Sequence, residues 1–349
     1  MNEDKLDNNN IDIRVDDFSK FINELKQKFS ENTEEVKKLA NLIQQEKKDK
    51  HIERPFDMLF IPSRGLFYDS KENYLLLNHL TFVEESLLTS EFLVESGKAM
   101  EFVLKNILVE QNVKPSELLS GDVQAIGLFL CSYAYGDKLN IKFTCPYCEF
   151  SEEVPIRLSS FQMKDLVVAP EIGLIPMILD GSELFFMFKP LTYFEEIGME
   201  RAKISSLDKL IYMTQSINGC EDKKIISQVI RRMKISEIRR VKKFLERAIP
   251  GVDTIVKHTC SSCEKQNSSD FGGLHSFLSF PPTFRESVQE ECFLVSYYGK
   301  GITFDDAKRM PVTERKWMLN RINEELTKKH EAEKKAHRQA KAKAKSKRL

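Results

Sequence analysis

Long apolar runs and a secretory leader are both missing from this chain. No stretch of its 349 residues reaches the ~20 apolar residues that a transmembrane helix needs. The first ten residues, MNEDKLDNNN, are acidic and polar, whereas a signal peptide is basic and then apolar. We therefore expect no association with a membrane and a protein that stays in the cytoplasm of the cell that makes it.

The sequence also lacks the short motifs of the common enzyme classes. No GxxxxGK[ST], GxSxG, HExxH or GxGxxG string is present, and the six histidines are scattered. Carboxylates are abundant, but abundance alone describes a surface and does not define a catalytic set. We therefore expect no catalytic residues, no cofactor-binding residues for an organic group, no small-molecule substrate and no enzymatic activity.

Cysteine is scarce, and its seven copies are better explained as reduced thiols or metal ligands than as a disulfide framework. Cys131, Cys220 and Cys292 stand alone and are interpreted as lone buried thiols. The hydrophobic content of 41% is enough to fill a core, and the length allows two domains or one large domain with insertions.

Charge is balanced overall but unevenly placed. Residues 328–349 contain ten Lys and Arg against two Glu, a net charge of about +8, so the rest of the chain carries about −8. A nucleic-acid-binding domain normally places its positive excess on a folded face, so nucleic acid is disfavoured as a partner. We expect the tail to be a solvated helical extension.

The first 50 residues are predicted to be a charged, amphipathic helical segment. Between Asp16 and about Lys48, apolar residues recur at spacings of three and four, with an interruption near residues 30–33. The segment either folds back on its own domain or binds a partner as a coiled segment, and the sequence leaves both open.

Helices and strands follow in mixed order from residue 52. RPFDMLFIPSRGLFYD is predicted to be extended, residues 81–119 helical in pieces with Thr81 and Ser116 as caps, and Asp122 is predicted to cap a helix that ends at Gly136. KLNIKFTCPYC and EEVPIRL should form a hairpin, and LIPMILDGSELFFMF two strands around an Asp-Gly turn. Three helical runs are expected between about Tyr193 and Ala248, then a strand over residues 252–257.

Two Cys-x-x-Cys pairs carry the most specific chemical signal. Cys145 and Cys148 follow one strand, and Cys260 and Cys263 follow another, 111 residues later. Four thiolates delivered in this way are typical of a structural Zn²⁺ site in a zinc ribbon, with the intervening residues as a folded insertion. Unpaired thiols in a degenerate knuckle, or a redox dithiol, are the alternatives; redox motifs normally open a helix, and both pairs here are flanked by extended residues.

Two features qualify this prediction. Glu149 and Glu264 follow the pairs at positions where knuckles often have Gly. His258 could replace a cysteine as ligand, although a position on the strand face fits it better.

The C-terminal third is predicted to contain three helices. The first should place Phe284, Val288, Cys292, Phe293 and Tyr297 along one side and end at Gly299. A second helix should be capped by Thr303. A third should run from Pro311 to Leu326 and on into the tail, with Thr313 as its cap and an apolar side formed by Trp317, Leu319 and Ile322.

These patterns predict an α+β protein, mostly helical, with a zinc-ribbon-like pair of β-hairpins, a long α/β insertion and a C-terminal helical module. The expected domains are the N-terminal segment 1–50, a domain over 51–280 with its insertion at 149–259, the helical module 281–327 and the basic tail 328–349.

The order of four features resembles baseplate proteins of contractile-tailed, T-even-like bacteriophages. The features are IPSRGLFYD, the helices before the strand that ends in CPYC, the later CSSC, and LVSYYGKGITFDDAKRMPVTERKWMLNRI. The first three resemble baseplate hub subunits over about residues 52–280. The last is similar to a Tyr-Gly and Met-Pro-x-x-x-Arg pattern of small hub-assembly proteins and tail chaperones.

The resemblance implies a structural or assembly part of the baseplate hub, found in the virion tail or in the cytoplasm of the infected host. Its expected partners are other hub subunits and the tape-measure protein. The alternative is a zinc-ribbon regulator that binds nucleic acid through the basic tail.

Overall fold

The computed structural model describes residues 54–109, 113–166, 170–171, 173–271, 280–281 and 283–346. The chain divides into two compact units, residues 1–51 and 52–349, and all the described residues belong to the second. The amphipathic segment predicted between Asp16 and Lys48 lies outside the described residues.

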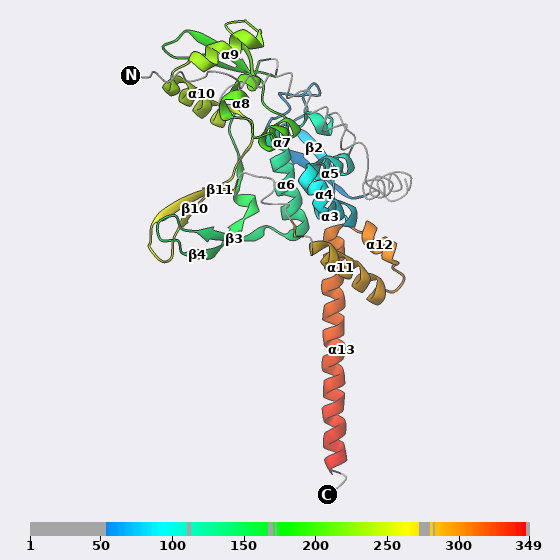
Figure 1. Ribbon diagram of the computed structural model, residues 1–349. Coiled ribbons are helices and arrows are strands. Elements are labelled where there is room, and N and C mark those ends of the chain that lie inside the picture. Colours follow the sequence, from blue (N-terminus) through cyan, green and yellow to red (C-terminus); the bar gives the residue numbers. More distant parts are fainter. Residues whose placement is uncertain are drawn as a thin grey trace, which may run out of the picture. The chain divides into compact units, whose positions relative to one another are not determined.

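Helices make up most of the regular structure of the second unit (Figure 1). They are α3 (Phe82–Leu88), α4 (Glu91–Ser96), α5 (Ala99–Ile107), α6 (Ser120–Tyr135), α7 (Tyr193–Arg201), α8 (Ser206–Met213), α9 (Lys223–Arg232), α10 (Ile235–Ala248), α11 (Phe284–Tyr298), α12 (Phe304–Arg309) and α13 (Val312–Ser346), with short 3-10 turns at Pro115–Glu117 and Leu158–Ser160.

The strands form small antiparallel sheets, which confirms the α+β class. Four sheets have two strands each: β1 (Phe56–Phe60) with β2 (Tyr74–Asn78), β3 (Lys138–Thr144) with β4 (Ser151–Arg157), β5 (Gln162–Met163) with β9 (Val252–Asp253), and β10 (Ile255–Thr259) with β11 (Gln266–Asp270). The fifth has the order β6 (Ile175–Leu179), β7 (Leu184–Phe188) and β8 (Thr214–Ile217).

The start of the unit follows the sequence prediction in part. The predicted extended segment is a strand only over Phe56–Phe60 and continues as turns, β2 was not predicted, and two helix caps differ. Thr81 caps α3 through a capping box, and α6 ends at Gly136, whose φ is +99°. Ser116 lies inside a 3-10 turn, and α6 begins at Ser120, before Asp122. Asp122 is buried and accepts from Ser63 N at 2.9 Å and from the Tyr68 hydroxyl, so its carboxylate ties the IPSRGLFYD loop to α6 instead of capping the helix.

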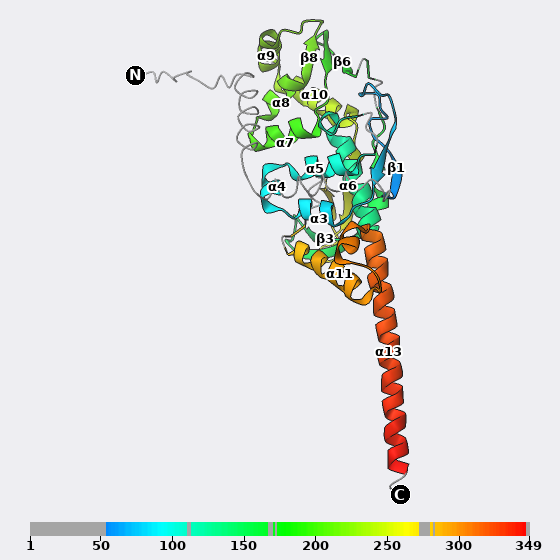
Figure 2. The same cartoon turned by 90° about the vertical axis from the view of Figure 1, so that its right-hand side faces the viewer.

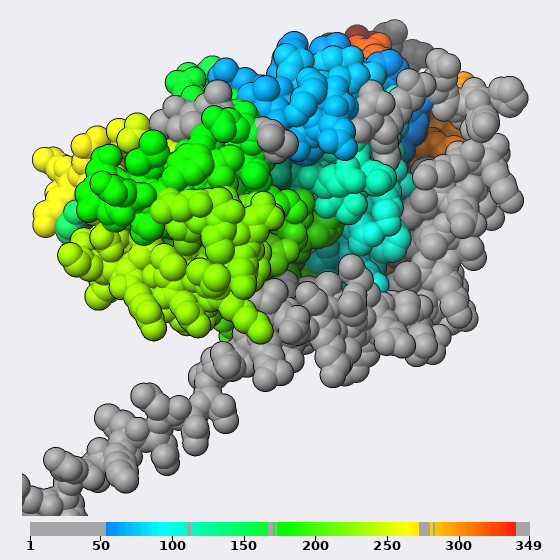
Figure 3. Space-filling view, turned by 90° about the horizontal axis from the view of Figure 1, so that it is seen from above, coloured from blue at the N-terminus to red at the C-terminus, as the bar shows by residue number. Residues whose placement is uncertain are grey.

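The region from Tyr193 to Ala248 contains four helices and a strand, not the three helical runs predicted. The short strand β5 was not predicted either, and the strand predicted over residues 252–257 is divided into β9 and β10. The β6–β7 hairpin forms around the Asp-Gly turn as expected, and Gly181 there has a φ of +83°. The residues after α8, TQSI, leave the helix and pair with β7. The additional strand β8 separates α8 from α9, and α10 closes the insertion. Figure 3 shows the green surface of this insertion beside the blue and cyan surface of β1, β2 and α3–α5.

The C-terminal helices meet the rest of the unit at α3 and α6. Gly299 ends α11 and a capping box at Thr303 begins α12, as predicted. Thr313 lies within α13, which begins at Val312, so it is not a cap. Trp317 is 64% exposed and Phe293 and Tyr297 also face solvent, because the buried side of α13 is occupied by Val312 and Arg315 and that of α11 by Val288, Cys292 and Val295. Beyond Glu325 the helix continues into the tail, as the sequence suggested, and extends away from the other elements of the unit (Figures 1 and 2).

No helix within the described ranges combines the length and hydrophobicity needed to cross a membrane. Among the isolated thiols, Cys131 and Cys292 are buried as predicted, and Cys220 is partly exposed.

Candidate metal centre

Two β-hairpins hold the cysteine pairs at their turns. Cys145 and Cys148 lie between β3 and β4, and Cys260 and Cys263 lie between β10 and β11. The two turns repeat one hydrogen-bond pattern: Cys145 N donates to Phe150 O, as Cys260 N does to Lys265 O. Glu149 N donates to Cys145 O, and Glu264 N to Cys260 O, all four bonds between 2.9 and 3.0 Å. The sequence therefore builds the same knuckle twice, and neither turn opens a helix of the kind that redox motifs use.

The residue after each pair adopts the left-handed conformation. Glu149 and Glu264 both have a φ of +58°, where a side chain costs about 1 to 2 kcal/mol relative to ordinary backbone. This is the position where Gly was expected, and the backbone follows the knuckle geometry with Glu in place. The two Glu residues therefore strain the knuckles without preventing them.

The four sulfur atoms form one compact cluster. All lie within 4.8 Å of one another, with Cys145 Sγ 3.6 Å from Cys263 Sγ and Cys148 Sγ 3.7 Å from Cys260 Sγ. Thiolates at ~2.3 Å from a tetrahedral zinc ion are separated by roughly 3.8 Å. Cys145 and Cys260 are buried, whereas Cys148 is exposed and Cys263 partly so. The donor set and its spacing therefore fit a four-thiolate metal ion.

Electrostatics at the cluster also favour a cation. Burial opposes the ionisation of Cys145, but the backbone N–H groups of Tyr147 and Cys148 and the Asn267 amide outweigh it and lower its pKa to about 6. Cys263 receives a backbone N–H from Lys265, yet burial and the neighbouring sulfurs raise its pKa to about 12. One thiolate therefore forms readily while a second resists ionisation beside it, and a divalent cation would relieve that conflict.

A buried amide supports the cluster from β11. Asn267 Nδ2 donates to Cys145 Sγ at 3.4 Å and to Lys265 O at 3.3 Å. N–H donors to sulfur are characteristic of the groups that surround metal-bound thiolates, because they disperse the negative charge. Asn267 is not predictable from the sequence, because nothing in QNSSD distinguishes it from its polar neighbours; it faces the cluster because β11 pairs it with His258.

His258 contacts the other hairpin and is not part of the thiol cluster. Its Nε2 lies 2.9 Å from Glu152 Oε1, and its ring packs on Phe143 with 5.1 Å between centroids. The interactions of Glu152 with His258 and with the backbone and side chain of Ser261 lower its pKa to about 2. The strand-face position expected for His258 is therefore observed, and Glu152, missed from the sequence, joins the hairpins beside the cysteines.

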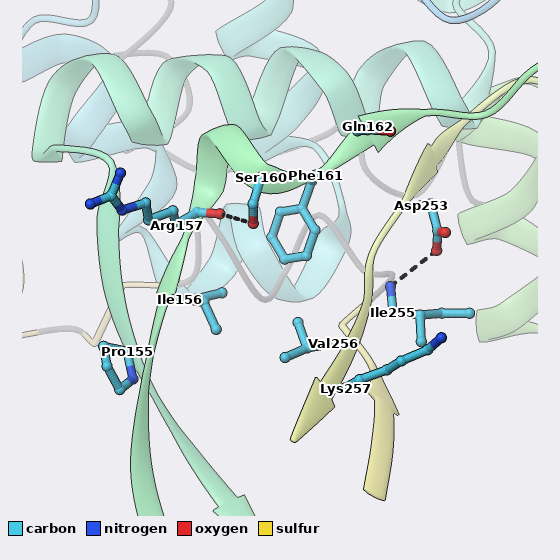
Figure 4. Close-up of a pocket in the computed structure, with 10 residues that line it drawn as sticks. All are labelled: Pro155, Ile156, Arg157, Ser160, Phe161, Gln162, Asp253, Ile255, Val256 and Lys257. Carbon is cyan, nitrogen blue, oxygen red and sulfur yellow. Dashed lines mark hydrogen bonds between the residues drawn. The ribbon is translucent and has the colours of Figure 1, made fainter. Parts of the chain in front are cut away.

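A groove lies between the same hairpins, farther from the cysteines. Its cavity volume is about 450 Å³, and β4, β10 and the 3-10 turn after β4 line it. Figure 4 shows Ile156, Phe161 and Val256 around this space. The hairpins thus touch at the knuckles and through the β5–β9 pair, and they separate between these two points.

Fold and cluster together define an α+β protein in which two cysteine knuckles bring the ends of a long insertion to one place. A family model described as T4 bacteriophage base plate protein matches residues 78–279, more than half of the chain, including both knuckles. The chain belongs to this family. No curated protein and no solved structure matches the chain.

Family membership confirms the broader part of the resemblance. The family supports a structural role in a phage baseplate, points to the tail of the virion, and implies interaction with other phage tail proteins.

Proposed function

We propose that the protein is a structural or assembly component of the baseplate hub of a contractile tail, and that it acts through protein interfaces without catalytic turnover. The family match supports a baseplate role, and the sequence resemblance to hub subunits and hub-assembly proteins supports the narrower one. Other hub subunits and the tape-measure protein are the proposed partners.

The proposed metal is zinc, held by Cys145, Cys148, Cys260 and Cys263. The observation that carries this proposal is the convergence of two equivalent knuckles on one four-sulfur cluster. Four thiolates fill a tetrahedral ion, so the metal would hold the hairpins together and leave no position at which to bind and activate water. This supports a structural protein over an enzyme.

The proposed domains are those predicted from the sequence. Residues 51–280 form the hub-like domain, with the insertion 149–259 closed by the metal. Residues 281–327 form a helical module, residues 1–50 an N-terminal amphipathic segment, and residues 328–349 a basic, solvated extension of α13.

The hub assignment is tested in infected cells. Without the gene, heads and fibres should accumulate, but complete baseplates and tails should be missing from electron micrographs. Mass spectrometry of purified particles would then show whether the protein stays in the virion or acts during assembly only. Normal tails formed without the protein would contradict both forms of the proposal.

The zinc assignment is tested on the purified protein. Elemental analysis should give one zinc per chain, and Cys145→Ser and Cys260→Ser should each remove it and lower the melting temperature by similar amounts, because they break one site. Cys220→Ser is the matched control, since this thiol is partly exposed and outside the cluster. Fresh protein without zinc, or serine variants as stable as the wild type, would refute the assignment.

The rival function is a zinc-ribbon regulator that binds nucleic acid. The exposed basic end of α13 is the observation in its favour. Binding to random duplex DNA that weakens steeply with salt, together with normal tails in the gene deletion, would support this rival.

A further inference from the structure

Strand β1 presents apolar side chains to solvent from the edge of its sheet. Phe56, Met58 and Phe60 are 53%, 52% and 57% exposed, and they alternate along one face of the strand. The opposite face is partly buried: Asp57 Oδ2 lies 2.8 Å from His79 Nε2, and Leu77 of the paired strand is fully buried. Figure 2 shows β1 as the outermost strand at one margin of the unit.

The pairing of β1 with β2 determines which backbone groups of β1 are already hydrogen-bonded. His79 N donates to Pro55 O, and Ile61 N donates to Asn73 O, both at 3.0 Å, at the two ends of the register. Hydrogen-bonded pairs in an antiparallel ladder recur every second residue, so Asp57 and Leu59 bond to β2. The N–H and C=O groups of Phe56, Met58 and Phe60 therefore point away from β2, and no described residue pairs with them.

The sequence of this edge, FDMLF, is symmetric in its exposed residues. Antiparallel pairing of two copies with Met58 opposite Met58 places Phe56 opposite Phe60 on both sides. Each copy then donates from three N–H groups to three C=O groups of the other, which closes six hydrogen bonds. Each Phe also meets an aromatic cross-strand neighbour, a pairing that stabilises antiparallel sheets.

We propose that β1 is an interface between two copies of this protein, joined as a four-stranded sheet in the order β2, β1, β1, β2 about a twofold axis at Met58. The exposed residues Phe, Met and Phe occur in the same order from either end of β1, so two antiparallel copies place like side chains opposite each other. This self-complementarity favours a second copy over an unrelated strand. The proposal does not depend on the hub assignment.

The area of this surface predicts a weak pair. A large side chain such as Phe buries about 150 to 250 Å², so Phe56, Phe60 and the similarly long Met58, each about half exposed, offer roughly 300 Å² per copy and roughly 600 Å² in the pair. Stable complexes bury ~1,200 Å² or more. The dimer should therefore form at high protein concentration and become fully occupied where an assembly brings copies together.

The first experiment measures association of the full-length, zinc-loaded protein by sedimentation over a wide range of concentration. The wild type should dimerise reversibly. Met58→Pro removes an N–H on the outer edge, which β2 does not use, and should weaken the dimer at least roughly tenfold with little change in melting temperature. Leu59→Pro, the matched control, removes an N–H bonded to β2 and should lower the melting temperature instead.

The register is tested by crosslinking. Met58→Cys should give dimers with a short bis-maleimide, because the two residues face each other across the axis about 5.5 Å apart between Cα atoms. Leu59→Cys and the wild type measure the background from other positions and from the native cysteines. Met58→Lys, which places two like charges on the axis, provides a second dissociating variant if the proline variant fails to fold.

A wild type that stays monomeric at the highest attainable concentration and gives no crosslink through Met58→Cys would overturn the proposal. So would a dimer that Met58→Pro and Met58→Lys leave unchanged, since its interface would lie elsewhere. If the wild type is monomeric and Met58→Lys prevents incorporation of the protein into tails, then a strand of another protein, or another part of this chain, covers β1. Failure of the hub assignment would show instead in tail formation, so the two results are separable.

Discussion

Arg315→Met should be among the most destabilising single substitutions in the C-terminal helices. Arg315 projects from α13 and is fully buried; its Nη2 donates to Glu85 Oε2 at 2.6 Å and its Nε to Glu291 Oε2 at 2.9 Å. Glu85, on α3, is 1% exposed and also accepts from the Tyr135 hydroxyl at 2.8 Å. Arg315 thus joins α13 to α11 and α3, and Glu85 extends the network to Tyr135 on α6.

The magnitude follows from what the substitution leaves behind. Burial raises the pKa of Glu85, and Arg315 is the largest influence that opposes this rise. Without Arg315 the buried carboxylate loses its hydrogen-bonded ion-pair partner, and removal of one partner of a buried ion pair costs about 3 to 5 kcal/mol. For a unit of this size, that loss corresponds to a melting temperature roughly 10 °C lower. Arg315→Met combined with Glu85→Gln should recover part of the loss, because no unpaired charge is then buried.

Urea unfolding with two probes measures the effect. Far-ultraviolet circular dichroism reports on all helices, and fluorescence of Trp317, the only tryptophan, reports on α13. Because Arg315 joins the C-terminal helices to the family region, both probes should shift together by the same free energy. A loss below about 1 kcal/mol would refute the role given to Arg315. A shift in fluorescence alone would show that residues 281–327 unfold independently.

Three further perturbations test other parts of the fold. Glu149→Gly and Glu264→Gly should each raise the free energy of unfolding by about 0.5 to 1 kcal/mol, because Gly adopts the left-handed conformation without strain. Glu153→Gly within β4 is the control and should lower the free energy of unfolding. Melting curves unchanged by the two knuckle substitutions would contradict the strain. Deletion of residues 328–349 should leave the melting temperature nearly unchanged, because side chains of α13 from Asn323 to Gln339 are exposed; a large drop would mean that the tail is packed. Hydrogen bonds from Thr303 lower the pKa of Asp306 in the folded protein below the usual carboxyl value of 3.8. The charged carboxylate therefore stabilises the fold above pH 3.8, and this stability is lost as the pH falls through the lowered pKa of the folded state. The melting-temperature gap between wild type and Asp306→Asn should therefore narrow below pH 3.8, and a gap independent of pH would exclude this origin.

Local signals predicted much of the fold. Alternation on both sides of Cys145 and Cys148 predicts the β3–β4 hairpin, and the Asp-Gly turn predicts β6–β7. Thr81 and Thr303 are predictable as caps because capping depends on residues only three apart. The four-sulfur cluster was also predictable, since two equal spacings after two strands admit few other arrangements.

Errors arose where tertiary contacts override local preference. Asp122 has the chemistry of a cap, but its carboxylate is bound by Ser63 and Tyr68 from a distant loop. TQSI has no strong strand pattern and becomes β8 because β7 offers it a partner. The apolar side assigned to α13 was wrong at Trp317 because Arg315, an unusual residue for a core, takes the buried position next to it.

Apart from the four cysteines, few contacts among the described residues hold the two hairpins together. β3–β4 and β10–β11 are isolated two-stranded sheets, a form that is marginally stable by itself in water. Their facing sides contribute Phe143, Ile156 and the His258–Glu152 pair, and a groove, not a packed core, separates them farther along. In the chain-entropy model, a crosslink between residues about 100 positions apart raises the free energy of the unfolded chain by roughly 4.7 kcal/mol. A metal ion at the four sulfurs would supply such a link between Cys148 and Cys260, and would hold the two hairpins together although a long segment of chain lies between them in sequence.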